Sequence, residues 1–259
     1  MGRVLAIANQ KGGVGKTTTA VNLAACLALQ RKKVVAIDID PQGNTTSGLG
    51  IDRRRIRRSI YHVLVEETPI KEVILPTAIR RLHLVPATID LAGAEIEMVS
   101  LVAREARLRQ ALRSIRDEYD FLLIDCPPSL GLLTINALTA ADQVLIPIQC
   151  EYYALEGLGQ LLHTIRVVQS RLNPDLEIEG VVLTMFDGRT NLSIQVAEEV
   201  KRHFREKVHR AVVPRNVRLS EAPSHGKPVI LYDPHCRGAE VYRDLAREVM
   251  GNGEAERAG

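Results

Sequence analysis

One stretch decides the fold of this 259-residue chain: Gln10-Lys11-Gly12-Gly13-Val14-Gly15-Lys16-Thr17-Thr18. Its end, Gly15-Lys16-Thr17, fits the phosphate-loop pattern G-x-x-x-x-G-K-[ST]. The pattern requires glycine at position 10, where this chain has Gln10, and a second lysine follows at Lys11. The sequence therefore predicts a phosphate loop of unusual form, with two cations beside the phosphates.

The residues on both sides of this loop place it between a strand and a helix. Arg3–Ala8 is a short apolar run typical of a buried strand, and Thr17–Leu29 is rich in Ala and Leu at helical spacing. Glycines let backbone N–H groups turn towards phosphate oxygens, and the positive end of the helix dipole points to the same place. We expect Lys16 to contact the β- and γ-phosphates and Thr17 to ligate Mg²⁺. The alternative is a Gly-rich turn with incidental lysines.

Aspartates follow two further apolar runs. Lys33–Ile39 leads into Asp38-Ile39-Asp40, and the apolar run that starts at Tyr119 ends in Asp125. Alternate residues of a strand share a face, so Asp38 and Asp40 are expected to point together towards the phosphate loop. Asp125 stands where a Walker B aspartate holds Mg²⁺, at the edge where open α/β sheets bind ligands. The alternative for each aspartate is a helix cap or a turn.

Strand and helix patterns alternate along most of the chain. This alternation predicts an α/β fold of the P-loop NTPase kind, with a mainly parallel twisted sheet and helices on both faces. We expect one domain over residues 1–250 and a disordered tail over 251–259. Further expected strands are Leu82–Val85, Gln143–Pro147, Ile178–Thr184 and Val208–Val213, and further expected helices are Glu95–Glu118, Tyr153–Leu172 and Ser193–Lys207.

Composition excludes several classes of protein. With 46% hydrophobic and 25% charged residues, the chain can bury a full core. No apolar stretch approaches the ~20 residues of a membrane span, and we expect no signal peptide. The cysteines are widely spaced and predict neither disulfides nor a metal site, as expected of a cytoplasmic protein. They are Cys26, Cys126, Cys150 and Cys236.

Three further segments, together with the phosphate loop, resemble a known family. With its two lysines, that loop is the deviant Walker A motif of the ParA/MinD ATPases, and the other segments resemble the chromosomal ParA (Soj) branch. The resemblance implies ATP and Mg²⁺ as cofactors, slow hydrolysis, a homodimer with two sandwiched nucleotides, nonspecific binding of double-stranded DNA and a ParB-type partner that stimulates hydrolysis. The segments are Asp125–Ser129, Gln149–Gly157 and Pro214–Ser224.

The resemblance also implies roles for individual residues. Lys11 would reach the partner subunit's phosphates, much as an arginine finger does. Asp40 would position or activate the attacking water, and Asp38 would lie near the magnesium. Gly12 would be crowded at the dimer interface. The nucleotide contacts carried over are Lys11, Gly12, Gly13, Val14, Gly15, Lys16, Thr17 and Thr18 in the loop, with Met185, Pro214 and Asn216 near the adenine.

Charge is concentrated late in the chain. Residues 201–218 hold seven cations and one anion, a net charge of +6, whereas the whole chain carries +3. Such a stripe is typical of phosphate binding, although a solvated surface is the alternative. By resemblance, Arg189 and Arg218 contact DNA, and we add Arg215 from the same stripe. The basic run Arg53–Arg58 is interpreted first as a solvated surface, with auxiliary DNA or partner contact as the alternative.

Four other functions remain to be distinguished. A MinD-like membrane ATPase needs a C-terminal amphipathic helix, whereas this chain ends in a Gly-rich segment with Glu254 and Glu256. A nitrogenase-reductase-like protein needs cysteines that bridge an iron–sulfur cluster, and Cys126 has no evident partner. A ligase related to dethiobiotin synthetase would lack the basic stripe. A nucleotide-gated scaffold would differ from a partition ATPase only in the partner that it binds. We favour a nucleoid-associated ATPase of chromosome or plasmid partition.

Overall fold

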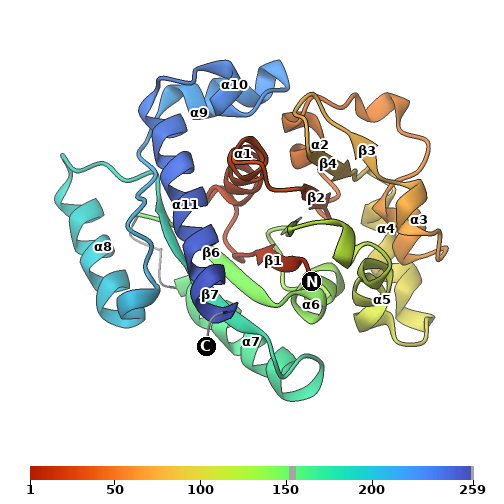
Figure 1. Ribbon diagram of the computed structural model, residues 1–259. Helices are drawn as coiled ribbons and strands as arrows, with labels where there is room; N and C mark the ends of the chain where they lie inside the picture. Colours follow the sequence, from red (N-terminus) through yellow and green to blue (C-terminus); the bar gives the residue numbers. More distant parts are fainter. Residues whose placement is uncertain (152–155, 258–259) are drawn as a thin grey trace.

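A single mixed sheet forms the centre of the molecule (Figure 1). The computed structural model describes residues 1–151 and 156–257. Within them, seven strands pair in the order β3-β4-β2-β5-β1-β6-β7, all parallel except β3 with β4. This confirms the predicted α/β fold. The strands are β1 (Arg3–Ile7), β2 (Val34–Asp38), β3 (Leu75–Pro76), β4 (Leu82–Val85), β5 (Phe121–Asp125), β6 (Gln143–Gln149) and β7 (Glu177–Thr184).

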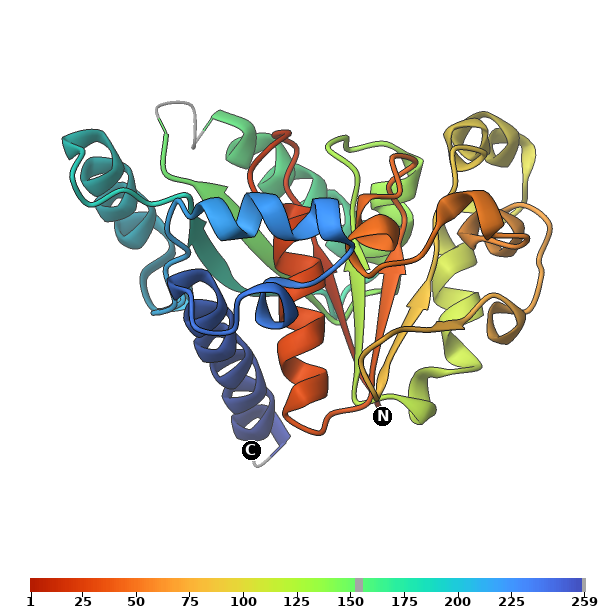
Figure 2. The same ribbon diagram turned by 90° about the horizontal axis from the view of Figure 1, so that it is seen from above.

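Helices cover both faces of this sheet (Figures 1 and 2). One face packs against α1 and α11, and the other packs against α3, α5, α6 and α7. The helices are α1 (Lys16–Leu29), α2 (Asn44–Gly48), α3 (Ile60–Leu64), α4 (Leu91–Glu97), α5 (Arg107–Arg113), α6 (Leu132–Ala140), α7 (Glu156–Arg171), α8 (Asn191–Phe204), α9 (Val217–Glu221), α10 (Val229–Tyr232) and α11 (Arg237–Arg257).

Apart from Arg3, Asp38 and Asp125 at their ends, the central strands β1, β2 and β5 are apolar because both of their faces are buried. In β1, Leu5 and Ile7 enter the core beneath α1, while Val4 and Ala6 enter the core on the opposite face. All residues of β1, β2 and β5 are buried. A parallel sheet covered on both sides gives this continuous pattern in place of an alternating one.

One expected strand is absent from the sheet. Val208–Val213 runs beside β7, but it forms only an isolated bridge, between Val208 and Val181. The backbone N–H groups of Arg210 and Ala211 donate to the carboxylate of Glu248, each at 2.9 Å. The backbone N–H groups of His209 and Val213 do bond to β7, at 2.9 and 2.8 Å, but the bonds to α11 between them interrupt a continuous ladder, so the prediction of a strand here was wrong.

The expected helices differ in three places. Glu95–Glu118 is broken between α4 and α5, because Ala103 takes a left-handed conformation (φ 51°) and the chain bends there. The expected start of the next helix, Tyr153–Leu155, lies outside the described residues, and α7 begins at Glu156. α11 was not predicted. It continues to Arg257, where a disordered tail was expected from residue 251, although the segment contains Gly251 and Gly253, which favour helix least.

A buried charge cluster attaches α11 to the sheet. His209 contacts Glu179 of β7 at 2.7 Å and Glu248 of α11 at 3.0 Å. Arg3 of β1 lies 3.6 Å from Glu179. Burial by itself would lower the pKa of His209, but its bonds to Glu179 and Glu248 outweigh burial and the pKa is raised.

The raised pKa of His209 predicts a pH-dependent stability. Protonated His209 stabilises the folded state fully below its unfolded pKa of roughly 6.5, and this contribution is lost as pH rises through the raised folded value. We expect His209→Gln to lower the free energy of unfolding by about 1–3 kcal/mol at pH 6 and to reduce its pH dependence. Urea unfolding between pH 6 and 9 measures both effects. His203→Gln, at an exposed site on α8, is the control, and an unchanged pH slope in His209→Gln would contradict the prediction.

Candidate nucleotide-binding site

The phosphate loop leaves β1 and enters α1 at the edge of the sheet where the parallel strands end. Gly13 and Gly15 have left-handed backbones, with φ of 76° and 88°. Other residues adopt this conformation at a cost, so both glycines are required by the turn. Gly12 has no such requirement, and a Cβ added to it would meet only Pro128, at 3.9 Å.

Lys16 is held inside the loop. Its ammonium group donates to the backbone oxygen of Lys11 at 2.9 Å, and the side chain is only 6% exposed. Burial lowers the pKa of Lys16, and the nearby carboxylates of Asp125 and Asp40 act in the opposite direction. The loop thus presents a cation at the position where phosphate oxygens would lie.

The bonding of Asp125 indicates where a cation would bind. Its Oδ2 accepts hydrogen bonds from the hydroxyls of Thr17 and Thr45, both at 2.8 Å. Its Oδ1 is buried and has no hydrogen-bond partner among the residues that the structure describes. Burial, reinforced by Asp38, raises the pKa of Asp125 to about 7. A divalent cation would satisfy the unbonded oxygen, and a carboxylate beside a threonine hydroxyl suits Mg²⁺.

The other two aspartates lie close by but differ in their bonding. Asp38 uses both oxygens within the protein: Oδ2 accepts from the backbone and hydroxyl of Thr46, and Oδ1 accepts from the backbone of Asp40. Burial raises its pKa to about 6. Asp40 accepts a bond from the backbone of Gln42 at 2.9 Å. Asp38 therefore shapes the turn that carries Asp40, and of the two expected metal-binding carboxylates only Asp125 keeps an oxygen unbonded.

A cleft of about 230 Å³ adjoins the start of α1. It brings together the three residues expected near the adenine, Met185, Pro214 and Asn216, with Gly15 and Thr18 of the loop. A base joined to phosphates in the loop would lie in this direction. Met185 follows β7 with a left-handed backbone (φ 50°), which is uncommon for a residue with a side chain.

The arginines expected to bind DNA lie on the surface, and each is paired with a carboxylate. Arg189 precedes α8, is 89% exposed, and pairs with Asp187 at 2.7 Å. Arg215 pairs with Glu151 at 3.0 Å. Arg218 on α9 has two partners, Glu221 at 2.8 Å and Asp233 at 3.3 Å. Exposed pairs of this kind contribute little to stability, so they leave the guanidinium groups able to exchange partners.

The basic run Arg53–Arg58 forms a surface turn. Arg54 and Arg55 pair with Asp52, and Arg58 pairs with Glu72. Arg53 donates to the backbone oxygen of Gln42. These local bonds favour the interpretation as a solvated surface.

Several threonines belong to the site although no sequence motif pointed to them. Thr45 and Thr46 bind Asp125 and Asp38 through their hydroxyls, and the hydroxyl of Thr184 donates to the backbone oxygen of Val14 at 2.8 Å. Thr45 and Thr46 follow directly on the segment from Asp38 to Asn44. Their position after a run of carboxylates and turn residues was the available signal.

Known proteins similar to this chain identify its family. A family model described as an AAA domain (AAA_31) matches residues 2–178. The sporulation initiation inhibitor protein Soj of Bacillus subtilis (strain 168) is 64% identical over 98% of this chain and 100% of its own length. The chain belongs to the ParA/Soj family. The chromosome partitioning protein ParA of Myxococcus xanthus is 59% identical, over 96% of this ParA/Soj chain and 88% of its own length.

Solved structures agree with the family assignment of this ParA/Soj chain. One is described as cobyrinic acid a,c-diamide synthase from Mycobacterium smegmatis with bound ADP and magnesium (TM-score 0.87, 38% identity, covering 99% of this chain and 97% of that one). Another is the cell division ATPase MinD of Pyrococcus furiosus (TM-score 0.79, 28% identity, covering 97% and 99%). Within the described residues of this chain, no helix is both long and apolar enough to cross a membrane.

The raised pKa of Asp125 predicts how stability changes with pH when no divalent cation is present. A carboxyl whose folded pKa is about 7, against roughly 3.9 unfolded, binds its proton more tightly in the folded state, so its contribution to stability falls as pH rises between these values. We expect Asp125→Asn to raise the free energy of unfolding at pH 8 by on the order of a few kcal/mol, and much less at pH 4. Chemical denaturation in EDTA measures this. Equal effects at both pH values would contradict the prediction.

Proposed function

We propose that this chain is a slow, Mg²⁺-dependent ATP hydrolase that acts in chromosome or plasmid partition. The observation that carries the nucleotide chemistry is the unbonded oxygen of Asp125 beside the Thr17 hydroxyl and the Lys16 ammonium. Partition is supported by the names of the relatives at 64% and 59% identity, described as Soj and as a chromosome partitioning protein. The cobyrinic acid a,c-diamide synthase of similar structure is only 38% identical in sequence. It therefore supports a metabolic role less strongly than Soj and ParA support partition.

Each residue of the site has its own role in this proposed reaction. Lys16 leaves the oxygen of Lys11 and binds the β- and γ-phosphates of ATP, while backbone N–H groups of the loop hold the remaining phosphate oxygens. Thr17 and Asp125 would hold Mg²⁺, and the ion would supply positive charge to offset the charge that develops on the phosphates. Asp40 orients the attacking water. Burial of these groups strengthens each charge interaction with the transferred phosphoryl group.

A second copy of the chain completes the site in this proposal. Lys11 is half-buried in the loop, and in this proposal its ammonium group acts on the phosphates bound by the second copy. In other systems, a cation supplied in this way increases the rate of phosphoryl transfer by a factor of roughly 10³–10⁵. Gly12 beside it is exposed and has space for a side chain within one chain. We infer that its lack of a side chain serves close contact with the second copy.

Gly12→Val tests this inference. The variant is expected to fold and to bind ATP but to remain monomeric, because the new side chain has room in one chain and none against a second copy. Light scattering after size-exclusion chromatography, with ATP, ADP or no nucleotide, gives the mass. Gly13→Val is the matched control, since a left-handed backbone makes it disturb the loop itself and lower ATP affinity. ATP-dependent dimers of Gly12→Val would refute the inference.

The same assay should distinguish the roles of Lys11 and Lys16. Lys11→Ala is expected to bind ATP yet fail to dimerise, whereas Lys16→Ala is expected to weaken ATP binding itself. ATP affinity measured by calorimetry and mass measured by light scattering distinguish the two effects. A Lys11→Ala protein that still dimerises with ATP would contradict the role in trans.

We further propose that the ATP-bound dimer binds DNA through Arg189, Arg215 and Arg218, and that a ParB-type protein stimulates hydrolysis and releases it. The nucleoid of the cytoplasm is then its expected location. DNA phosphates would replace the exposed carboxylate partners of these arginines. Phosphate contacts carry no base information, so sequence preference should be slight. Membrane attachment through α11 is disfavoured, because its apolar residues Tyr242, Leu245 and Val249 are buried in the core.

DNA binding should depend on nucleotide and on salt. We expect tight binding to a sequence-neutral duplex with ATP and weak binding with ADP or without nucleotide. If a dimer makes about four to six phosphate contacts, log K should fall with log salt at a slope of roughly −4 to −5. Arg218→Glu should abolish the ATP-dependent binding, while Arg113→Glu, an equal charge change on α5, should not. Equally weak binding in all three nucleotide states would remove DNA from the proposal and leave the ATP site unaffected.

A further inference from the structure

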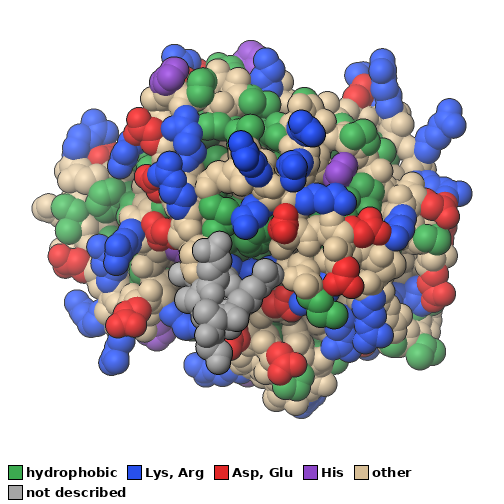
Figure 3. Space-filling view, in the orientation of Figure 1, with side chains coloured by type: hydrophobic (Ala, Val, Ile, Leu, Met, Phe, Trp, Pro, Cys, Tyr) green, Lys and Arg blue, Asp and Glu red, His purple; other side chains and the backbone are tan. Residues whose placement is uncertain are grey.

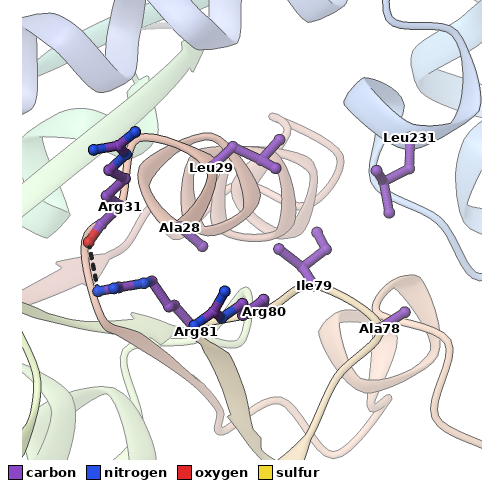
Figure 4. Close-up of a pocket in the computed structure, with 8 residues that line it drawn as sticks. All are labelled: Ala28, Leu29, Arg31, Ala78, Ile79, Arg80, Arg81 and Leu231. Atoms are coloured by element: carbon purple, nitrogen blue, oxygen red, sulfur yellow. Dashed lines mark hydrogen bonds between the residues drawn. The ribbon is translucent and has the colours of Figure 1, made fainter.

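A second hollow lies at the far end of α1 from the phosphate loop. It has a volume of about 550 Å³, within the usual range for ligand sites. α1 has 14 residues, so at 1.5 Å per residue the hollow is about 20 Å from Lys16. It lies between the end of α1, the turn before β4 and α10 (Figure 4). Its walls are Ala28, Leu29, Arg31, Ala78, Ile79, Arg80, Arg81 and Leu231.

One side of this hollow is basic. Arg31, Arg80 and Arg81 are exposed, and within the described chain none of them lies within ion-pair distance of a carboxylate. Arg81 donates to the backbone oxygen of Arg31 at 3.0 Å, and this bond links the two loops (Figure 4). Figure 3 shows Lys and Arg side chains gathered over the same end of α1. In contrast, Arg189, Arg215 and Arg218 are each paired with a carboxylate.

The other side of the hollow is aliphatic. Ile79 lies below Leu29 and Leu231, directly before Arg80 in the chain, and is buried at 6% exposure (Figure 4). Leu29 is 51% exposed and Leu231 is 42% exposed, although both are large apolar side chains. Scattered exposed leucines are common, but these two lie together on one hollow beside a basic rim, so they offer an apolar contact next to charge.

Backbone strain is concentrated at the basic side. Arg31 and Arg81 both have left-handed backbones, with φ of 69° and 73°. Arg31 follows directly on the C-cap of α1, the position where glycine is most often found. A residue with a side chain adopts this conformation at an energetic cost. Strain retained at two facing residues is a feature of functional sites.

We propose that this hollow binds an acidic segment of a partner protein, with an aliphatic side chain of that segment seated between Leu29, Ile79 and Leu231. The unpaired guanidinium groups supply charge complementarity for Asp or Glu side chains, and Arg forms strong paired bonds with carboxylates. Duplex DNA would use the arginines but would leave the aliphatic side uncovered, and a small inorganic anion would do the same. The proposal does not depend on the ATPase cycle.

Selection of peptides tests the proposal directly. A phage-displayed library of random dodecapeptides is selected on the wild-type protein, and the enriched peptides are synthesised with a fluorescent label. We expect sequences that combine Asp or Glu with Leu, Ile or Val. Their affinity, measured by anisotropy, should fall about tenfold or more in Arg80→Glu/Arg81→Glu and in Leu231→Asp. Unchanged ATP hydrolysis verifies that these variants fold.

Arg31→Gly separates binding from stability. Glycine relieves the left-handed backbone, so the melting temperature should rise, while the loss of the cation should weaken the selected peptides severalfold. A protein that is merely destabilised cannot give this combination. Unchanged peptide affinity in Arg31→Gly would overturn the role of the basic side.

Three results would overturn the proposal as a whole. The first is enrichment of basic peptides, or of none. The second is complete displacement of the selected peptides by inorganic phosphate but not by sodium chloride at the same ionic strength. That result would indicate a site for small anions. The third is a loss of DNA binding in Arg80→Glu/Arg81→Glu that is as large as the loss in Arg218→Glu, while peptide affinity stays unchanged. That result would make this surface part of the DNA interface.

Discussion

The parallel register of β1, β5 and β2 is the constraint on which the nucleotide site depends. Asp125, the last residue of β5, pairs in register with Ile7 of β1 and with Asp38 of β2. The phosphate loop follows Ile7, and the turn that carries Asp40 follows Asp38. Neighbouring parallel strands end at the same edge of the sheet, so three segments distant in the sequence deliver their polar groups to one place.

This convergence has an electrostatic consequence. Three carboxylates with little exposure to solvent face one ammonium group, and burial raises the pKa of Asp125 and of Asp38. The protein compensates in part through threonine hydroxyls, which donate to both carboxylates. The oxygen of Asp125 that remains unbonded is an unmet requirement within the described chain, and such groups are rare in folded proteins unless a ligand serves them.

The two ends of α1 have different chemistry. At its start, left-handed glycines open the backbone towards phosphates, because no side chain is needed there. After its end, Arg31 holds the same kind of backbone at an energetic cost and presents a guanidinium group beside an aliphatic hollow. Between them, the helix is buried against the sheet and α11, so it connects the two surfaces as a rigid element.

The sequence by itself determined the six parallel strands of the described sheet, the phosphate loop and the three aspartates that follow apolar runs, because continuous apolar runs and glycine-lysine spacing are local signals. It did not predict the short strand β3. It could not determine that Val208–Val213 would bond to α11, or that Ala103 would break a helical pattern, since both depend on distant contacts. Tertiary structure alone brought Met185 and Asn216 to the loop and gathered Arg31 and Arg81 around one hollow. The physical reason is that side-chain proximity across crossovers depends on strand order and helix packing, which no local pattern encodes.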